Sequence, residues 1–300
     1  MNLNVVRDDL HYFGLGTKVR KISGLVKWLK SEGINQVVLR GSLHGNFLAS
    51  YCYILYNLGF LVRVFAYTRD KNLLSPNRIL IKHHSHELRI FHSFVEMNES
   101  ISIEEKQMMN ANLYDSQKQQ SCYLPTYGIH PTALDGLSIL WKHPIFTTDS
   151  PKTIFLEIGS GVTFLSALSS LSNQNVSICG ISVGEPRDKW LLNSDTVASN
   201  LNLSVKLNQN TNFPQTSMPN IYILNPMQKS RFASIKKDDS SVLKSIYQRY
   251  GLLIEPVYGL KTWEYLLNPS ELPKDLPKPW IYLHQGGQLN HMDTNWMLES

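Results

Sequence analysis

The chain has 300 residues, of which 42% are hydrophobic and 18% are charged, so it can form one large domain or two moderate ones. The 29 basic residues barely exceed the 24 acidic ones, and no lysine- or arginine-rich run is present, so we expect no nucleic-acid partner. Cys52, Cys122 and Cys179 stand far apart and predict neither a disulfide framework nor a zinc site. We find no apolar run long enough for a membrane and no N-terminal signal core, so we expect a soluble, cytoplasmic protein.

The first part of the chain predicts strands alternating with helices. A short strand at 4–6 precedes a helix at 18–31, which has apolar residues on one face and is followed by Gly33. A strand at 36–40, a helix at 47–58 and a strand at 60–67 follow. This alternation predicts parallel strands joined by crossover helices.

The middle of the chain, 68–120, is polar and carries a histidine cluster. His83, His84 and His86 lie in a stretch where basic and apolar residues alternate, and 98–120 predict an exposed helix or loop. No carboxylate stands at ligand spacing beside these histidines, so we predict no metal site.

Alternation of strands and helices returns after residue 152. We predict strands at 153–157, 176–182, 220–224 and 280–283, and helices at 164–171 and 240–250. The sequence therefore predicts an α/β protein of two units. A small inserted α/β domain, 24–128, interrupts a larger domain made of 1–23 and 129–300.

A small-residue turn follows the strand at 153–157. Gly159, Ser160, Gly161, Val162 and Thr163 lead directly into a helix. The free N–H groups at such a helix start, together with the helix dipole, predict an anion site, most often for phosphate. A tight turn without a ligand is the structural alternative.

The same segment also resembles the first motif of S-adenosylmethionine methyltransferases. That motif requires a third close-packed glycine and an acidic residue at the end of the next strand. Val162 occupies the glycine position, and no acid follows the next strand before Glu185. A methyltransferase-like binder is therefore an alternative with two departures.

A second glycine-containing segment, 14–22, leads from a loop into the helix at 18–31. Gly14 and Gly16 permit backbone conformations closed to other residues, and Lys18 stands where the loop becomes a helix. A lysine in that place can be held against a ligand, although an isolated segment of this kind is also typical of a basic, solvated helix start.

Several segments, taken in order, resemble the 1-aminocyclopropane-1-carboxylate deaminase and D-cysteine desulfhydrase family over nearly the whole chain. Residues 6–10 and 16–22 resemble its "KRDDL…GNKxRKL" opening, and 41–46 its "GGxxSN" turn. Similar matches are found at 123–136 ("IPxGG…G"), 159–163 (the phosphate loop), 251–261 ("GIxxDPVYTGK") and 283–287 ("LHTGG"). The resemblance implies a pyridoxal-phosphate enzyme with the tryptophan-synthase β-like fold, which has two three-layer α/β/α domains with mainly parallel sheets.

The resemblance also implies roles for individual residues. Lys18 would form the Schiff base with pyridoxal 5′-phosphate and shuttle the substrate's α-proton. Asn46 would hydrogen-bond the phenolic oxygen of the cofactor, and the 159–163 turn would hold its phosphate. Gln285 would face the pyridine nitrogen, and Tyr258 would lie near the substrate as an acid or base. The resemblance further implies a homodimer.

The chain departs from the family mainly where substrate is held. Gly45 replaces a serine that grips the substrate carboxylate, and His44, in place of a glutamine, becomes the candidate donor to that carboxylate. Phe232 stands near the place of a second active-site tyrosine, and Gly259 follows Tyr258 where threonine or glutamate is frequent. An amide at 285 in place of threonine predicts an incompletely protonated ring nitrogen and a milder electron sink.

The sequence therefore predicts a lyase or deaminase that acts on a small amino acid by α,β-elimination or deamination, in the manner of a desulfhydrase. Opening of a cyclopropane substrate is disfavoured by the missing hydroxyls. A diverged family member with weak or no activity is the second interpretation, and the methyltransferase-like binder is the third.

Overall fold

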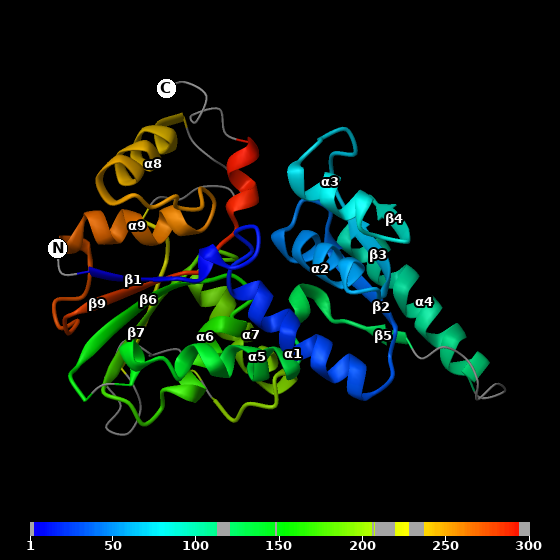
Figure 1. Cartoon of the computed structure of the whole chain (residues 1–300), viewed down its shortest axis with the longest axis horizontal. Helices are drawn as coiled ribbons and strands as arrows, with labels where there is room; N and C mark the ends of the chain where they lie inside the picture. Colours follow the sequence, from blue (N-terminus) through cyan, green and yellow to red (C-terminus); the bar gives the residue numbers. More distant parts are fainter. Residues whose placement is uncertain are drawn as a thin grey trace. The chain divides into compact units, whose positions relative to one another are not determined.

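The computed structural model describes residues 3–112, 121–147, 149–205, 207, 220–227 and 237–293 (Figure 1). Internal contacts divide the chain into unit 1, Met1–Lys21 with Ala133–Ser300, and unit 2, Ile22–Thr132. The division expected from the sequence, 1–23 with 129–300 around 24–128, lies close to this one.

Unit 1 is built on a parallel five-stranded sheet in the order β1-β9-β6-β7-β8 (Figure 1). Its strands are β1 (Leu3–Arg7), β6 (Lys152–Ile158), β7 (Val176–Ser182), β8 (Asn220–Leu224) and β9 (Trp280–His284). Its helices are α5 (Thr132–Trp141), α6 (Val162–Ser170), α7 (Arg187–Asn200), α8 (Lys237–Tyr250) and α9 (Gly259–Leu267). Short 3-10 turns cover Asp8–Leu10, Pro144–Phe146, Pro269–Glu271 and Gln288–Asp293.

The interior of this sheet explains why its strands were readable from sequence. β6 and β7 are buried along their whole length, and each carries a core of apolar residues, Ile154–Leu156 in β6 and Ile178–Cys179 with Ile181 in β7. Trp263 of α9, Ile246 of α8 and Tyr282 of β9 are among the buried side chains that pack together in the core of unit 1.

Strand order decides which loops of unit 1 meet. β9 pairs with β1 on one side and with β6 on the other, all in parallel. The carboxyl ends of neighbouring parallel strands share one edge of a sheet, which is where ligands bind in open α/β folds. The segments after β1, β9 and β6, which carry Lys18, Gln285 and the 159–163 turn, therefore start side by side.

Unit 2 contains a parallel four-stranded sheet in the order β4-β3-β2-β5. Its strands are β2 (Gln36–Ser42), β3 (Leu61–Tyr67), β4 (Glu87–Phe91) and β5 (Ser121–Tyr123). Its helices are α2 (Asn46–Asn57), α3 (Pro76–His83) and α4 (Phe94–Asn112), and the chain enters it within α1 (Thr17–Ser31). A 3-10 turn covers Thr126–Gly128.

The α/β class and the parallel sheets confirm the prediction, but β4 and β5 were not predicted. β4 is an edge strand, and its charged residues do not give the apolar pattern that predicts a strand. In the structure Glu87 accepts hydrogen bonds from Arg63 Nε (2.6 Å) and from Arg89. Helices α3, α5, α7 and α9 were also not predicted from the sequence. The expected helix or loop at 98–120 is, in its described part, the continuation of α4.

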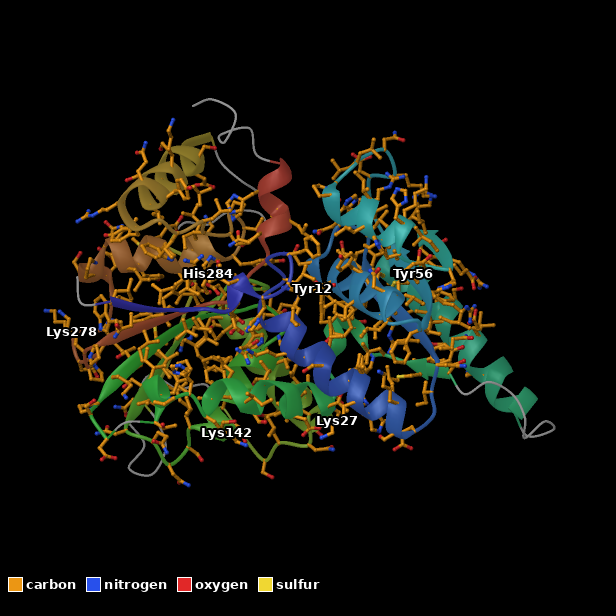
Figure 2. The ribbon with its side chains drawn as sticks, viewed as in Figure 1. Tyr12, Lys27, Tyr56, Lys142, Lys278 and His284 are labelled. Atoms are coloured by element: carbon orange, nitrogen blue, oxygen red, sulfur yellow. The ribbon has the colours of Figure 1, made fainter. Side chains whose placement is uncertain are left out.

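Two histidines of the cluster in unit 2, His84 and His86, make hydrogen bonds and ring contacts with residues of the same unit. His84 Nδ1 lies 2.9 Å from the carbonyl oxygen of Leu80, and His86 Nδ1 accepts a hydrogen bond from the N–H of Val62 at 3.1 Å. Both rings pack against the ring of Tyr56, which Figure 2 labels. Among the described residues, no group of His, Cys, Asp or Glu side chains gathers in a way that could hold a metal ion.

Candidate active site

Lys18 is placed by a close backbone contact between two loops of unit 1. Gly16 has φ +64°, and a Cβ at this position would lie 1.9 Å from the carbonyl oxygen of Gln285. The N–H of Thr17 donates to that same oxygen at 3.1 Å, and the N–H of Gly287 donates to the carbonyl of Gly14 at 2.8 Å. Lys18 is therefore fixed beside the segment that follows β9 because only glycine fits at 16.

An ion pair between Arg20 and Asp8 also holds the start of α1 in place. Arg20 donates to both carboxylate oxygens of Asp8 at 2.8 Å, and Asp8 is 2% exposed. A bidentate arginine–carboxylate pair fixes direction as well as distance. This gives a structural reason for the Arg-Asp-Asp segment at 7–9 and for Arg20 within the 16–22 motif.

Burial of Lys18 favours a neutral amine. Desolvation lowers the pKa of Lys18, while the carboxylates of Glu255 and Glu157 act in the opposite direction. Lys21, one turn further along α1, has its pKa lowered to about 7 by desolvation and by the charge of Lys18. A lysine must lose its proton before it can act as a nucleophile, so Lys18 fits that role.

The turn after β6 forms an anion cradle. Gly161 has φ +87° and is the N-cap of α6, and the N–H groups of residues 160–163 donate no hydrogen bond to any described residue. Free N–H groups at a helix start, aligned with the helix dipole, are the groups that bind phosphate. Gly159 leaves the cradle open, because a Cβ there would meet nothing within 4 Å.

Gln285 is held by Glu157, the penultimate residue of β6. Its Nε2 donates to the Glu157 carbonyl oxygen at 2.8 Å and to Glu157 Oε2 at 3.0 Å. Glu157 is 7% exposed, and its carboxylate also interacts with the buried phenol of Tyr282. Next to Gln285, His284 ends β9 in the interior of unit 1 (Figure 2).

Tyr258 is positioned by a second buried carboxylate, that of Glu255. Glu255 Oε2 accepts from the N–H of Tyr258 and, at 3.1 Å, from the N–H of Gly259, so it satisfies the exposed donors at the start of α9. Desolvation raises the pKa of Glu255 to about 7, against the effect of these hydrogen bonds. Tyr258 itself is half-buried as the N-cap residue of α9.

In unit 2, Asn46 lies at the start of α2 in an orientation set by Asn77. Asn77 Nδ2 donates to the carbonyl oxygen of His44 and to Asn46 Oδ1, both at 2.9 Å. Since a carbonyl can only accept, Asn77 must point its NH2 group toward both partners. Asn46 then accepts with Oδ1, which leaves its own NH2 group to donate elsewhere. A phenolate oxygen, the partner expected from the resemblance, is an acceptor that suits this NH2 group.

His44 is held within unit 2 by two hydroxyl groups. Its Nδ1 lies 2.7 Å from Ser75 Oγ, and its Nε2 lies 3.0 Å from Thr68 Oγ1. Because both ring nitrogens have partners, His44 reaches a substrate carboxylate only by giving one up. Gly45 precedes α2 with φ −84° and supplies no side-chain cap.

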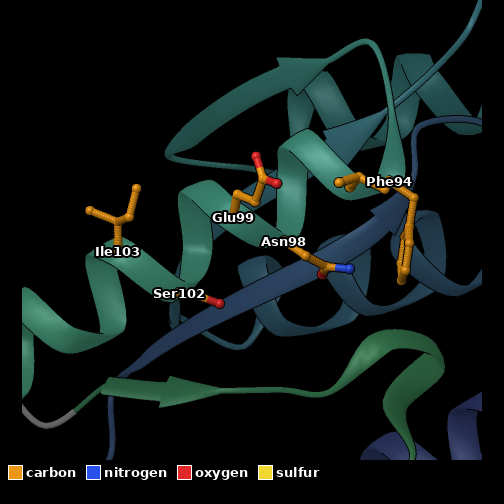
Figure 3. Close-up of a pocket in the computed structure, with 6 residues that line it drawn as sticks. Phe94, Asn98, Glu99, Ser102 and Ile103 are labelled. Atoms are coloured by element: carbon orange, nitrogen blue, oxygen red, sulfur yellow. The ribbon is translucent and has the colours of Figure 1, made fainter.

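The hollow shown in Figure 3 is not a second candidate. Its lining side chains all belong to one helix, α4. Phe94, Val95 and Ile103 there are exposed, and Glu99 is the only titratable group in the lining. This open helix face does not bring together the set of acid, base or nucleophilic groups that a catalytic site requires.

Comparison with known proteins agrees with these observations. No family model matches the chain. A curated protein of Pyrococcus abyssi, provisionally assigned as a 1-aminocyclopropane-1-carboxylate deaminase, is 24% identical over 300 residues, covering 96% of this chain and 84% of the relative. A protein of Thermotoga maritima with the same provisional assignment is 21% identical over 295 residues, covering 95% and 88%. The chain resembles the 1-aminocyclopropane-1-carboxylate deaminase family, as its motifs predicted.

Solved structures confirm the predicted tryptophan-synthase β-like fold. A homologue of 1-aminocyclopropane-1-carboxylate deaminase superimposes with a TM-score of 0.76 at 20% identity, over 99% of this chain and 88% of that one. Threonine deaminase isoform 2 of Solanum lycopersicum gives 0.60 at 12% identity, over 100% and 80%. A hydrogen sulfide-producing enzyme of Fusobacterium nucleatum gives 0.57 at 13% identity, over 95% and 90%.

The structure adds residues that sequence reasoning did not single out. Unit 1 carries Lys18, Gln285, the 159–163 turn and Tyr258, and unit 2 carries His44, Gly45 and Asn46. Glu157, Glu255 and Asn77 were given no role, although a glutamate inside an otherwise apolar strand is a signal that could have found Glu157. Phe232 lies outside the described residues, and the roles assigned to all site residues stay predictions.

Proposed function

We propose that the chain is a pyridoxal-phosphate-dependent lyase or deaminase that acts on a small amino acid by α,β-elimination or deamination. The observation that carries the proposal is the coincidence, in unit 1, of an open cradle of N–H groups with a lysine whose pKa is lowered by desolvation. The residues present fit the cofactor: a phosphate needs such a cradle, and its aldehyde needs a neutral amine. When bound, the cofactor supplies the electron sink for the bond that breaks at the substrate's α-carbon.

Three side chains of the protein, those of Lys18, Tyr258 and Asn46, would act on the substrate or the cofactor. Lys18 Nζ would hold the cofactor covalently and, once displaced by the substrate amine, move the α-proton. Glu255 accepts hydrogen bonds from the backbone N–H groups of Tyr258 and Gly259, so it fixes the position of Tyr258 at the start of α9. The Asn46 NH2 group, oriented by Asn77, would hold the phenolic oxygen of the cofactor in place.

The residues that the resemblance assigns to substrate binding favour an amino acid other than the cyclopropane compound. Gly45 lacks the hydroxyl that resemblance assigns to carboxylate binding, and both ring nitrogens of His44 have hydroxyl partners. Losing one charge-assisted hydrogen bond costs about 1.5–3 kcal/mol, or roughly one to two decades in affinity. We therefore expect negligible turnover of 1-aminocyclopropane-1-carboxylate and lower activity on any true substrate in His44→Ala. Gly45→Ser should tighten the binding of simple amino acids.

We also propose a cellular location and an oligomeric state for the protein. We expect a cytoplasmic homodimer without a nucleic-acid partner. The three cysteines are buried as free thiols, which suits a reducing compartment. Among the described helices, none combines the length and apolar character that a membrane crossing requires. The methyltransferase-like alternative draws no support from the fold, because the similar whole-chain structures reported above belong to other enzymes.

One experiment tests the central proposal. The purified protein is incubated with pyridoxal phosphate, reduced with borohydride and digested, and the peptides are mapped by mass spectrometry. We expect the phosphopyridoxyl group on Lys18, none in Lys18→Ala, and unchanged labelling in Lys27→Ala, since Lys27 is exposed on α1 (Figure 2). Labelling of another lysine, or of none, rejects the assignment. Uptake on Lys18 with no turnover of a panel of D- and L-amino acids would favour the diverged, inactive relative.

A further inference from the structure

The amide of Gln285 can present only one of its two ends to a ligand. Both groups that Nε2 contacts, the carbonyl oxygen and the carboxylate of Glu157, are acceptors without a proton to give. The NH2 group of Gln285 must therefore face Glu157, and no flipped amide satisfies the same contacts. What remains is the carbonyl oxygen Oε1, which accepts no hydrogen bond from the described residues.

Glu157 is well suited to fix this orientation. Its place in β6 buries it, between Leu156 and Ile158 in a strand with no exposed position. Its carboxylate oxygen Oε2 holds Gln285, and the carboxylate also interacts with the buried phenol of Tyr282. The phenol of Tyr282 is kept protonated, because burial, the charge of Glu157 and a hydrogen bond with Glu157 all raise its pKa.

We propose that Glu157, acting through Gln285, keeps the pyridine nitrogen of the bound cofactor protonated. This inference rests on the proposed function and on the expectation that Gln285 faces that nitrogen. An acceptor oxygen aimed at a ring nitrogen makes a hydrogen bond only if the nitrogen carries a proton. The buried carboxylate behind the amide favours the resulting positive charge, because Coulomb attraction is strong where water is excluded. Glu157 is thus a positioning residue, and the cofactor would be a stronger electron sink than an amide alone implies.

This arrangement alters the expectation drawn from sequence. An isolated amide can turn either end to the ring, so glutamine at 285 predicted a ring nitrogen that is not fully protonated. The contact with Glu157 removes that freedom and adds a charge.

The test reads the ring nitrogen directly. Pyridoxal phosphate labelled with nitrogen-15 in the ring is loaded onto the wild-type chain, and its nitrogen resonance is followed against pH. We expect a protonated nitrogen in the wild type across neutral pH and an unprotonated one in Glu157→Gln. The double variant Glu157→Gln/Gln285→Glu places a carboxylate directly at the ring and should restore protonation. Glu255→Gln, which removes the other carboxylate acting on Lys18, should leave the ring nitrogen protonated.

A binding measurement provides a second readout. The apo proteins are titrated with pyridoxal phosphate and with its 1-deaza analogue, in which a C–H group replaces the ring nitrogen. Loss of a hydrogen bond to a charged group should weaken binding of the analogue to the wild type about 10- to 100-fold, and the ratio should approach one in Glu157→Gln. Thermal melts of the apo variants check that the near-isosteric change leaves the fold intact.

The outcomes separate this inference from the proposed function. A wild-type chain that takes up no cofactor on Lys18 overturns both. A chain that takes it up on Lys18, but with an unprotonated ring nitrogen or with the same signal and affinity ratio in Glu157→Gln, overturns this inference alone.

Discussion

Replacing Gly16 by alanine tests whether the loop carrying Lys18 is locked to the segment after β9. A Cβ at Gly16 would lie 1.9 Å from the Gln285 carbonyl oxygen and 2.4 Å from its carbonyl carbon. Those are backbone atoms, so no side chain can rotate away. Gly251→Ala is the matched control, because Gly251 has φ +66° against +64° at Gly16, belongs to the same unit, and has nothing within 4 Å of a Cβ.

The control isolates the magnitude of the clash. Both variants place an L-residue in the left-handed region, at about 1–2 kcal/mol each. Gly16→Ala adds overpacking of about 1–3 kcal/mol and loss of the hydrogen bond from Thr17 N–H to Gln285, at about 0.5–1.5 kcal/mol. We therefore expect Gly251→Ala to lower the free energy of unfolding by about 1–2 kcal/mol and Gly16→Ala by about 2.5–6.5 kcal/mol.

Urea unfolding followed by tryptophan fluorescence measures both losses, with Trp190 and Trp263 buried in unit 1 as reporters. Cofactor attachment to Lys18 should also fall in Gly16→Ala and not in Gly251→Ala. Equal destabilisation by the two variants would refute the reasoning, because it would mean that the loop moves away from Gln285 at no cost.

Three further changes test other parts of the site. Gly159→Asp should weaken cofactor affinity at least tenfold by like-charge repulsion, and Gly159→Asn is the neutral control. Gly161 is less suitable for this substitution, because a Cβ there would lie 2.6 Å from the Trp190 ring. Asn77→Asp replaces the NH2 group that orients Asn46 with an acceptor, so stability should fall by about 1–3 kcal/mol in urea unfolding and cofactor affinity should fall with it. For Glu255 the pKa is raised from 4.5 to about 7, so the folded state holds a proton that the unfolded state releases. Stability present below pH 4.5 is therefore lost as the pH rises to about 7, on the order of 3 kcal/mol in total, and Glu255→Gln should flatten this window in pH-dependent melts. An equally steep pH dependence in that variant would assign the titration to another group.

The sequence by itself determined the fold class, the strands of the large sheet and the order of the family motifs. It could do so because parallel strands such as β6 and β7 are buried along their whole length and are rich in apolar residues, and glycine-containing turns follow them. The 159–163 turn and Lys18 were identifiable for a similar local reason, since backbone freedom and a helix start are encoded within a few residues. The edge strand β4 was not, because its charged residues are paired with Arg63 of the neighbouring strand, which lies far away in the sequence.

Only the tertiary structure decided how the site residues are oriented and charged. Glu157 and Gln285 are 128 residues apart, and they meet because β9 is inserted between β1 and β6. Asn77 orients Asn46 across 31 residues for a similar reason: it lies on α3, which packs against α2. Amide orientation, burial of a carboxylate and the lowered pKa of a lysine all depend on which groups surround a side chain and exclude water from it. No local pattern of residues specifies those surroundings.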